Sequence, residues 1–218
     1  ARTALGLDPD RPLAALTLTG FNDPSGETPA VRHRLLSLAS QGLPQEFQLA
    51  IKPHPIEKMA TLMPFVEKSA PQAAVIDGSV PIGDLLAATD VLLNRGVSQV
   101  AIEALDRKIP VVVLSAGRET PFHSLAPEVV ADSAAEVGEA VGRVCGGTGA
   151  KALYRDFFAE HMPYASAEAL TRTCRRLEQI VVGGEANRTT AADWLELALY
   201  QAWKIGRKEA LATLSSPQ

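Results

Sequence analysis

The chain has 218 residues, with 21 basic and 25 acidic side chains and a formal net charge of −4. This length and a hydrophobic content of 46% suit a globular protein with a sizeable core and exclude a collagen-like or disordered chain. The acidic balance argues against nucleic acid as the main partner, because neutralising phosphates requires a basic face. Two cysteines are too few for a disulfide framework, so we expect a reducing, cytoplasmic environment.

Short apolar segments alternate with helical patterns along the first two thirds of the chain. The segments predict buried strands at residues 13–19, 47–51, 73–76, 91–93, 110–114 and 128–131. The helical patterns lie at residues 28–40, 56–69, 81–88, 97–105 and 133–144. Gly42 is expected to stop the first helix, and Pro64 can interrupt the second. This alternation predicts an α/β fold, a doubly wound, Rossmann-like parallel sheet of about six strands.

A glycine-rich stretch at residues 146–149 predicts a boundary between two parts of the chain. We expect the sheet domain to occupy residues 1–145 and a helical extension to occupy residues 146–218. Within that extension, helical patterns cover residues 151–160, 165–182 and 190–214. Their apolar stripes are expected to pack on the sheet domain or on a domain that these residues do not include.

The segment 91–105 is the strongest candidate for a binding element. In open parallel sheets, ligands bind beyond the carboxyl ends of the strands. Here a strand leads through a turn containing Gly96 into a helix, whose first N–H groups and dipole favour an anion. Ser98 can add a hydroxyl donor, and Glu103 can accept from the hydroxyls of a ligand. Alternatively, Ser98 caps the helix and Glu103 is a solvated helical charge.

A second candidate lies in Lys52-Pro53-His54-Pro55, directly after a predicted strand. The two prolines restrict the backbone on both sides of the histidine, so that a stiff loop presents its ring. The imidazole can donate to a phosphate oxygen, with charge added by Lys52. The alternative is a histidine that bonds to a neighbouring carbonyl group.

Two further loops follow strands and carry weaker signals. Gly20 and the loop 21–26 come after the first strand, where backbone N–H groups can face a ligand. Arg118 follows the fifth strand and can pair with phosphate or carboxylate, although an exposed loop arginine fits the pattern equally well. The four histidines have no metal-ligand spacing, so we expect no metal.

Several well-known signatures are absent from the sequence. There is no G-x-x-x-x-G-K-[ST] loop, no G-x-S-x-G elbow and no G-x-G-x-x-G after the first strand. These absences count against a nucleoside triphosphatase, an α/β-hydrolase and an NAD enzyme. No apolar run is long enough to span a bilayer, and the first residues lack the pattern of a signal peptide.

Residues 88–98, Glu103-Ala104-Leu105 and residues 108–113 together resemble the donor-site signature of GT-B glycosyltransferases. In that signature an Ala-Asp-Val strand leads to a turn of small residues, a helix with Glu-Ala and a Lys-Pro-Val-Val strand. The stretch 52–55 is similar to the K/R-P-H-P motif of capsule- and lipopolysaccharide-type transferases, bacterial sialyltransferases and polyol-phosphate transferases. The resemblance covers about residues 5–144, because residues 5–13 look like the linker into the C-terminal domain of such enzymes.

The resemblance implies two facing Rossmann domains, of which the C-terminal one holds a nucleotide-sugar donor without an obligatory metal. Carried over to this sequence, it places Gly96, Val97, Ser98 and the helix start at Gln99 against the phosphates of the donor. It also implies that Glu103 binds ribose or sugar hydroxyls and that His54 touches phosphate. Many members have glycines where Val97 and Ser98 stand, and a Cβ there limits how closely a ligand approaches the backbone.

The length matches one of these two domains. We therefore expect the donor-binding half of a glycosyltransferase, inactive alone, with its catalytic base in a separate N-terminal acceptor-binding domain. The expected donor is UDP- or CMP-linked, with no further cofactor, and the expected role is bacterial surface polysaccharide synthesis in the cytoplasm, with membrane association through the missing domain. The alternatives are an enzyme like UDP-N-acetylglucosamine 2-epimerase and a non-catalytic binding or assembly module.

Overall fold

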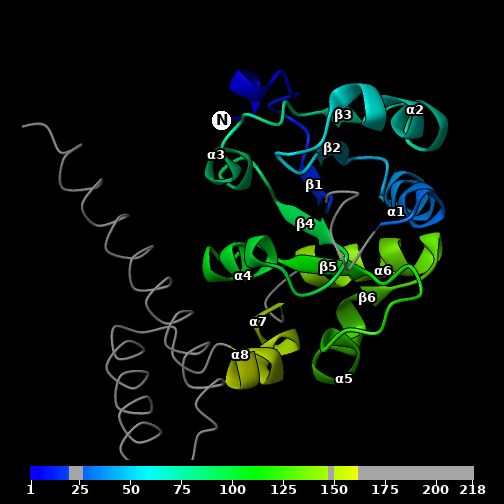
Figure 1. Ribbon diagram of the computed structural model, residues 1–218. Helices are drawn as coiled ribbons and strands as arrows, with labels where there is room; N and C mark the ends of the chain where they lie inside the picture. The colour runs from blue at the N-terminus through cyan, green and yellow to red at the C-terminus, as the bar shows by residue number, and fades with distance from the viewer. Residues whose placement is uncertain (20–26, 147–149, 162–218) are drawn as a thin grey trace, which may run out of the picture. The chain divides into compact units, whose positions relative to one another are not determined.

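Six parallel strands form one sheet in the order β3-β2-β1-β4-β5-β6 (Figure 1). The computed structural model describes residues 1–19, 27–146 and 150–161. The strands in this part of the chain are β1 (Leu13–Thr17), β2 (Gln48–Lys52), β3 (Ala74–Val75), β4 (Val91–Asn94), β5 (Val111–Leu114) and β6 (Val130–Ala131). The strand order reverses between β1 and β4, as in the Rossmann fold. The predicted α/β, doubly wound architecture is therefore confirmed.

Helices cover both faces of this sheet. The longer ones are α1 (Pro29–Gly42), α2 (Met59–Ser69), α4 (Gln99–Asp106) and α6 (Ala134–Cys145). The shorter ones are η1 (Arg2–Leu5), α3 (Ile82–Leu86), α5 (Phe122–Leu125), η2 (Pro127–Val129), α7 (Ala150–Leu153) and α8 (Arg155–His161). Helix α1 packs against both α2 and α6 on one face, while α3 and α4 lie on the other (Figure 1).

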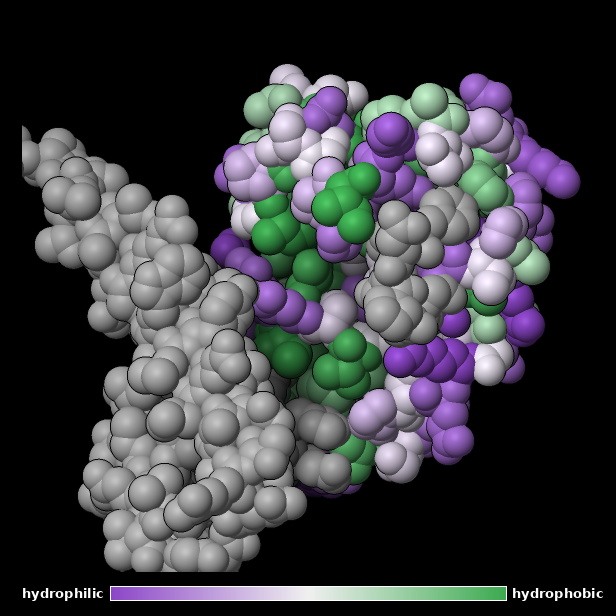
Figure 2. All heavy atoms as spheres, viewed as in Figure 1, coloured by the Kyte–Doolittle hydropathy of each residue, from purple (hydrophilic) through white to green (hydrophobic). Residues whose placement is uncertain are grey.

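The central strands β1, β4 and β5 are buried along their whole length. Their residues are mostly Leu, Val and Ala without alternation, because helices on both faces require each strand to be apolar on both sides. Partly buried residues such as Ile82 of α3 and Val100 of α4 pack against this core. Figure 2 shows apolar surface over these two helices.

The strand register brings the carboxyl ends of β1, β2 and β4 to the same level. Thr17, the last residue of β1, pairs with Lys52 at the end of β2, and Leu16 pairs with Leu93 in β4. The loops that follow these strands therefore emerge side by side at one edge of the sheet.

Some elements differ in detail from the sequence prediction. Helix α1 continues beyond the predicted end at residue 40 to Gly42, and the next residue, Leu43, is extended. A Cβ at Gly42 would lie 2.5 Å from the carbonyl oxygen of Ala134, so this glycine permits the close packing of α1 on α6. Pro64 lies inside α2 without interrupting it. The short helix α5 lies between the strands predicted at residues 110–114 and 128–131, where no helix was predicted.

The chain divides into two units, Ala1–His161 and Met162–Gln218, and all the residues that the structure describes belong to the first. Helices α7 and α8 belong to that unit, beyond the boundary expected at residue 145. The hydroxyl of Tyr154 donates to the carbonyl oxygen of Val111 at 2.7 Å and accepts from its N–H at 2.9 Å. The helices expected at residues 165–182 and 190–214 lie outside the described part of the chain.

Candidate functional site

A cavity of about 350 Å³ opens at the carboxyl edge of the sheet, beyond the ends of β1, β4 and β5. Its lining comes from Thr19 after β1, residues 94–98 after β4 and residues 118–121 after β5. The reversal of strand order between β1 and β4 creates a crevice at this point, where ligands of doubly wound sheets bind. Among the residues predicted from the sequence, those that line the cavity are Gly96, Val97, Ser98 and Arg118.

The buried side chain of Asn94 holds the turn between β4 and α4 in shape. Its Nδ2 donates to Oγ1 of Thr17 at 2.7 Å and to Oγ of Ser98 at 3.0 Å. Its Oδ1 accepts from the N–H of Gly96 at 3.0 Å. These bonds connect the end of β1, the turn and the start of α4, so this part of the cavity lining is held in one conformation.

Ser98 is the N-cap of α4, as the capping interpretation predicted. Its Oγ accepts the N–H of Ala101 at 3.1 Å. The N–H groups of Gln99 and Val100 also belong to the first turn and have no partner within the helix. A hydroxyl that accepts hydrogen bonds still has one hydrogen to donate. Ser98 can therefore cap the helix and donate to a ligand at the same time.

Gly96 allows two walls of the cavity to approach each other closely. Its φ is +155°, and a Cβ at this position would lie 2.9 Å from Cγ2 of Thr120 in the loop after β5. The neighbouring Val97 stands where many GT-B enzymes have glycine, and it is 41% exposed. Its side chain therefore lines the cavity without filling it.

The loop after β5 presents Arg118 on a tight, hydrogen-bonded turn. Ala116 and Gly117 have positive φ angles of 45° and 82°. Oγ of Ser115 donates to Oδ1 of Asp132 and accepts the N–H of Gly117 at 3.2 Å, and the N–H of Arg118 donates to the carbonyl oxygen of Ser115 at 2.9 Å. The backbone at Arg118 is thus fixed, while its side chain is exposed at the cavity.

His54 and Lys52 have different environments after β2. His54 is exposed, and its Nδ1 accepts the N–H of Ile56 at 3.4 Å. Lys52 is buried and donates to the carbonyl oxygens of Asp77 and Gly78 at 2.8 and 2.7 Å. Burial lowers the pKa of the Lys52 ammonium, and Asp77 opposes this change. The ammonium of Lys52 bonds to the turn after β3, because a buried charge requires acceptors, and its contribution of charge to a ligand stays a prediction.

Glu103 and Gln99 are not among the residues that line the cavity. Glu103 lies in the second turn of α4, where its Oε1 accepts from Nη2 of Arg107 at 2.9 Å. This contact fits the interpretation of Glu103 as a helical charge, and its binding of hydroxyls stays a prediction. Gln99 is exposed at the start of α4. Gly20 and the loop 21–26 lie outside the described residues.

The sequence patterns did not predict the structural role of Asn94 or the contribution of Thr19 and Thr120 to the cavity. The role of Asn94 could have been predicted, because an Asn two residues before a Gly at the end of a strand is typical of an Asx turn. No sequence pattern points to Thr19 or Thr120, since each reaches the cavity only because loops that are distant in the sequence pack together.

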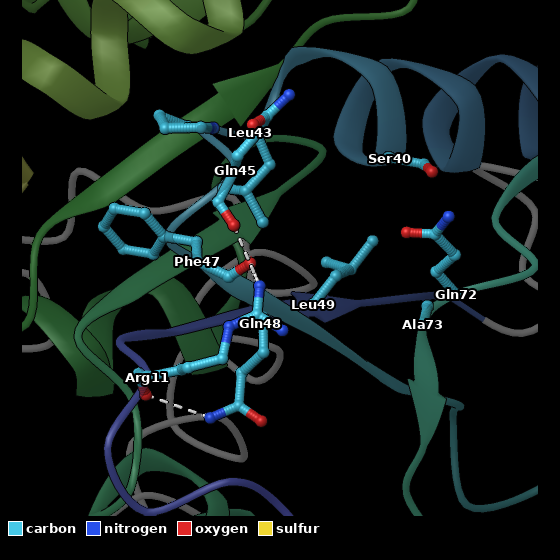
Figure 3. A pocket seen from close by; sticks show the side chains of 10 residues that line it. Arg11, Ser40, Leu43, Gln45, Phe47, Gln48, Leu49, Gln72 and Ala73 are labelled. Carbon is cyan, nitrogen blue, oxygen red and sulfur yellow. Dashed lines mark hydrogen bonds between the residues drawn. The ribbon is translucent and has the colours of Figure 1, made fainter.

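A second cavity, of about 340 Å³, lies at the opposite, amino edge of the sheet (Figure 3). Figure 3 shows Arg11 and Gln48 side by side in its lining. The guanidinium of Arg11 donates to the carbonyl oxygens of Gln45 and Phe47 at 2.9 and 2.5 Å. Nε2 of Gln48 donates to the backbone carbonyl oxygen of Arg11 at 3.0 Å. These polar side chains bind the chain's own backbone, so the carboxyl edge is better suited to a ligand.

Within residues 1–19, 27–146 and 150–161, no three His, Cys, Asp or Glu side chains gather as a set of metal ligands. In the same ranges, no helix combines the length and the apolar character needed to cross a membrane. Metal-free binding of a donor stays a prediction.

Solved structures with a similar fold include a glycosyltransferase, a complex with UDP and an epimerase bound to UDP-GlcNAc. The calicheamicin glycosyltransferase CalG4 is 19% identical, over 70% of this chain and 39% of that one, with a TM-score of 0.46. The UDP co-structure of S. aureus MnaA is 13% identical, over 80% of this chain and 47% of that one, with a TM-score of 0.48. The UDP-GlcNAc 2-epimerase from Neisseria meningitidis bound to UDP-GlcNAc is 15% identical, over 69% of this chain and 40% of that one, with a TM-score of 0.44. This chain spans less than half of each. No family model and no curated protein matches it.

Proposed function

We propose that this chain is the donor-binding domain of a GT-B glycosyltransferase and that the cavity at the carboxyl edge takes the phosphates of a nucleotide-sugar. One observation carries the proposal: the start of α4, with no acidic residue in its first turn, opens on a cavity that Arg118 also lines. A helix start offers N–H donors and a positive partial charge. The motif resemblance at residues 88–98 leads to the same turn.

The cavity offers a phosphate group three kinds of donor. The first turn of α4 supplies backbone N–H groups, Ser98 supplies a hydroxyl, and Arg118 supplies a guanidinium. A guanidinium forms paired, charge-assisted hydrogen bonds with phosphate oxygens. The volume of about 350 Å³ lies within the usual range of small-molecule sites. These features suit the phosphates, while the sugar and the base extend toward the open side.

These donors also suit the chemistry of glycosyl transfer. When the bond between the sugar carbon and the phosphate oxygen breaks, the electron pair stays with the nucleotide, whose phosphate gains negative charge. Donors held in place before the reaction stabilise this charge without reorganising. The bonds made by Asn94 keep the turn before α4 in one shape, which is the preorganisation that this role requires. The base that deprotonates the acceptor is assigned to a facing N-terminal domain.

The finer parts of the proposal come from the K-P-H-P motif at residues 52–55. His54 is exposed on the loop after β2, so its ring can donate to a phosphate oxygen of the donor. The motif resemblance favours a UDP- or CMP-linked sugar and a role in bacterial surface polysaccharide synthesis at the cytoplasmic side of the membrane. Lys52 serves here as a structural residue that holds the turn after β3.

The test is a thermal-unfolding panel of the full chain with UDP-, GDP- and CMP-sugars. A ligand present at 100 times its Kd stabilises the native state by about 2.7 kcal/mol, so we expect one nucleotide series to raise Tm. The variant Arg118→Gln should bind this series about tenfold more weakly, because it loses a charge-assisted bond. Arg143→Gln, which changes an exposed arginine on α6, is the matched control and should bind normally. A flat response to every series contradicts the proposal.

A further inference from the structure

Three charged side chains form a buried cluster beside the carboxyl edge, and the proposed function does not use them. Glu27 directly precedes α1, Arg32 lies in α1 and Glu57 lies in the loop between β2 and α2. The side chains of Glu27 and Arg32 are 0% exposed and that of Glu57 is 2% exposed. Burying charged groups costs free energy even when they are paired, so the position of this cluster calls for an explanation.

The guanidinium of Arg32 connects three separate segments. Its Nε donates to Oε2 of Glu27 at 2.9 Å, its Nη2 donates to the carbonyl oxygen of Thr19 at 2.7 Å, and its Nη1 pairs with Oε1 of Glu57. Oε1 of Glu27 accepts from both the N–H and the Oγ1 of Thr19, at 2.9 and 2.8 Å. Thr19 and Glu27 stand on either side of residues 20–26, so the cluster joins the two residues that flank this segment.

The cluster contacts the lining of the cavity at one end and the turn of His54 at the other. Thr19 lines the cavity. The N–H of Glu57 donates to the carbonyl oxygen of His54 at 2.9 Å, which closes a turn over residues 54–57. Arg32 thus links one wall of the cavity to the turn that carries His54, although the two are far apart in the sequence.

Stability alone does not account for this arrangement. Buried ion pairs can often be replaced by apolar residues without loss of stability. Moreover, Oε2 of Glu57 is buried and has no hydrogen-bond partner among the residues that the structure describes. An unsatisfied carboxylate oxygen is costly, so the benefit of Glu57 is better sought in the geometry that it fixes.

We propose that Arg32 is a positioning residue, which acts through Thr19 and Glu57 to hold the His54 turn in register with the cavity. Arg32 is fully buried and does not itself touch a ligand. The part of this inference that concerns nucleotide affinity rests on the proposed function. The part that concerns the order of the turn does not.

The affinity test is a mutant cycle in the full chain, with the nucleotide that gives the largest thermal shift and calorimetry as the readout. Glu57→Ala and His54→Ala should each weaken binding about tenfold, which is the range expected for one hydrogen bond to a charged group. The double variant should bind no more weakly than His54→Ala, because Glu57 acts through His54. Glu57→Gln keeps an acceptor for Arg32 and should restore most of the affinity. Additive losses in the double variant overturn the proposal.

The second test needs no ligand and measures amide hydrogen exchange. In Glu57→Ala and in Arg32→Lys, the N–H groups of Ile56 and Glu57 should exchange at least tenfold faster, while those of α6 should not change. Glu139→Ala breaks an exposed ion pair on α6 and is the control. Unchanged exchange at residues 56 and 57 in Glu57→Ala overturns the positioning role. Faster exchange in a chain that binds no nucleotide supports the positioning role and contradicts the proposed function.

Discussion

Helices α4 and α6 begin at the same edge of the sheet with the same serine cap, yet their first turns differ. Ser98 (φ −135°, ψ 162°) and Ser133 (φ −130°, ψ 161°) have nearly the same backbone, and each accepts the N–H of the third residue after it. In α6 the carboxylate of Glu136 accepts the N–H groups of Asp132 and Ser133 at 2.7 and 2.9 Å. In α4 the residue at the equivalent position is Ala101.

The difference shows what a helix start needs in order to bind a ligand. Helix α6 supplies its own anion: its capping box satisfies the N–H groups of Ser133 and Glu136 and stabilises the fold. Helix α4 has no such anion and faces the cavity that Arg118 lines. A positive helix start that lacks a carboxylate of its own can attract the phosphate of a ligand. The contrast between Ala101 and Glu136 therefore distinguishes the helix proposed to bind a phosphate from one that carries its own carboxylate.

The largest effect is expected from Gly96→Ala, which narrows the turn in front of α4. The new Cβ would lie 2.9 Å from Cγ2 of Thr120 at a φ of +155°. Overpacking of this kind costs about 1–3 kcal/mol, to be measured by urea unfolding. Adding Thr120→Ser removes Cγ2 and should recover part of the loss. Gly78→Ala, where a Cβ meets nothing within 4 Å, is the control. An equal loss in both glycine variants would show that the close approach to Thr120 is not the cause.

The two serine caps allow a direct comparison. Ser98→Ala and Ser133→Ala should each destabilise the chain by about 1 kcal/mol, because each leaves an N–H of the first turn without its acceptor. Only Ser98→Ala should also reduce the rise of Tm produced by a nucleotide, since Ser133 does not line the cavity. If both variants lost this response equally, the distinction between α4 and α6 would be wrong.

The fold was readable from the sequence because its strands are short apolar runs bounded by turn residues. The run predicted at residues 110–114 corresponds to β5 (Val111–Leu114), and six predicted segments correspond to six strands. Helix α5 was missed because its four residues, Phe122–Leu125, are too few to show a helical period. Boundaries also shifted: α2 begins at Met59 instead of residue 56, after the turn that His54 closes with Glu57.

Sequence patterns predicted the site residues in the turn after β4 and Arg118 in the loop after β5, because both segments directly follow a predicted strand. Gly96 and Ser98 lie in one turn between a strand and a helix, and this local pattern identified both. By contrast, Thr120 and the partners of Lys52 come from other loops, so no local pattern reveals them. The cluster around Arg32 likewise depends on Glu57, which the fold alone brings within reach.

Gln99→Glu is expected to have a smaller effect: it should raise the stability of the chain and lower its affinity for a nucleotide. Gln99 is the exposed first residue of α4. A negative charge in the first turn should stabilise the helix by about 0.3–1 kcal/mol. The same charge should repel the phosphate of a nucleotide, so that Tm rises without ligand while affinity falls. Gln99→Lys should reverse both signs. If the affinity rose with Gln99→Glu, phosphate would not bind at the start of α4.

The smallest change is expected at α6, from Glu136→Gln followed as a function of pH. The N–H groups of Asp132 and Ser133 lower the pKa of the Glu136 carboxyl below its ordinary value of 4.5. A group whose pKa is lower in the folded state contributes stability above its unfolded pKa and loses it as the pH falls through the folded pKa. The native chain should therefore have a higher Tm than Glu136→Gln at pH 7, and the difference should vanish toward pH 3. The native chain and Glu136→Gln should bind a nucleotide equally well, because the start of α6 interacts with the carboxylate of Glu136 and not with a ligand.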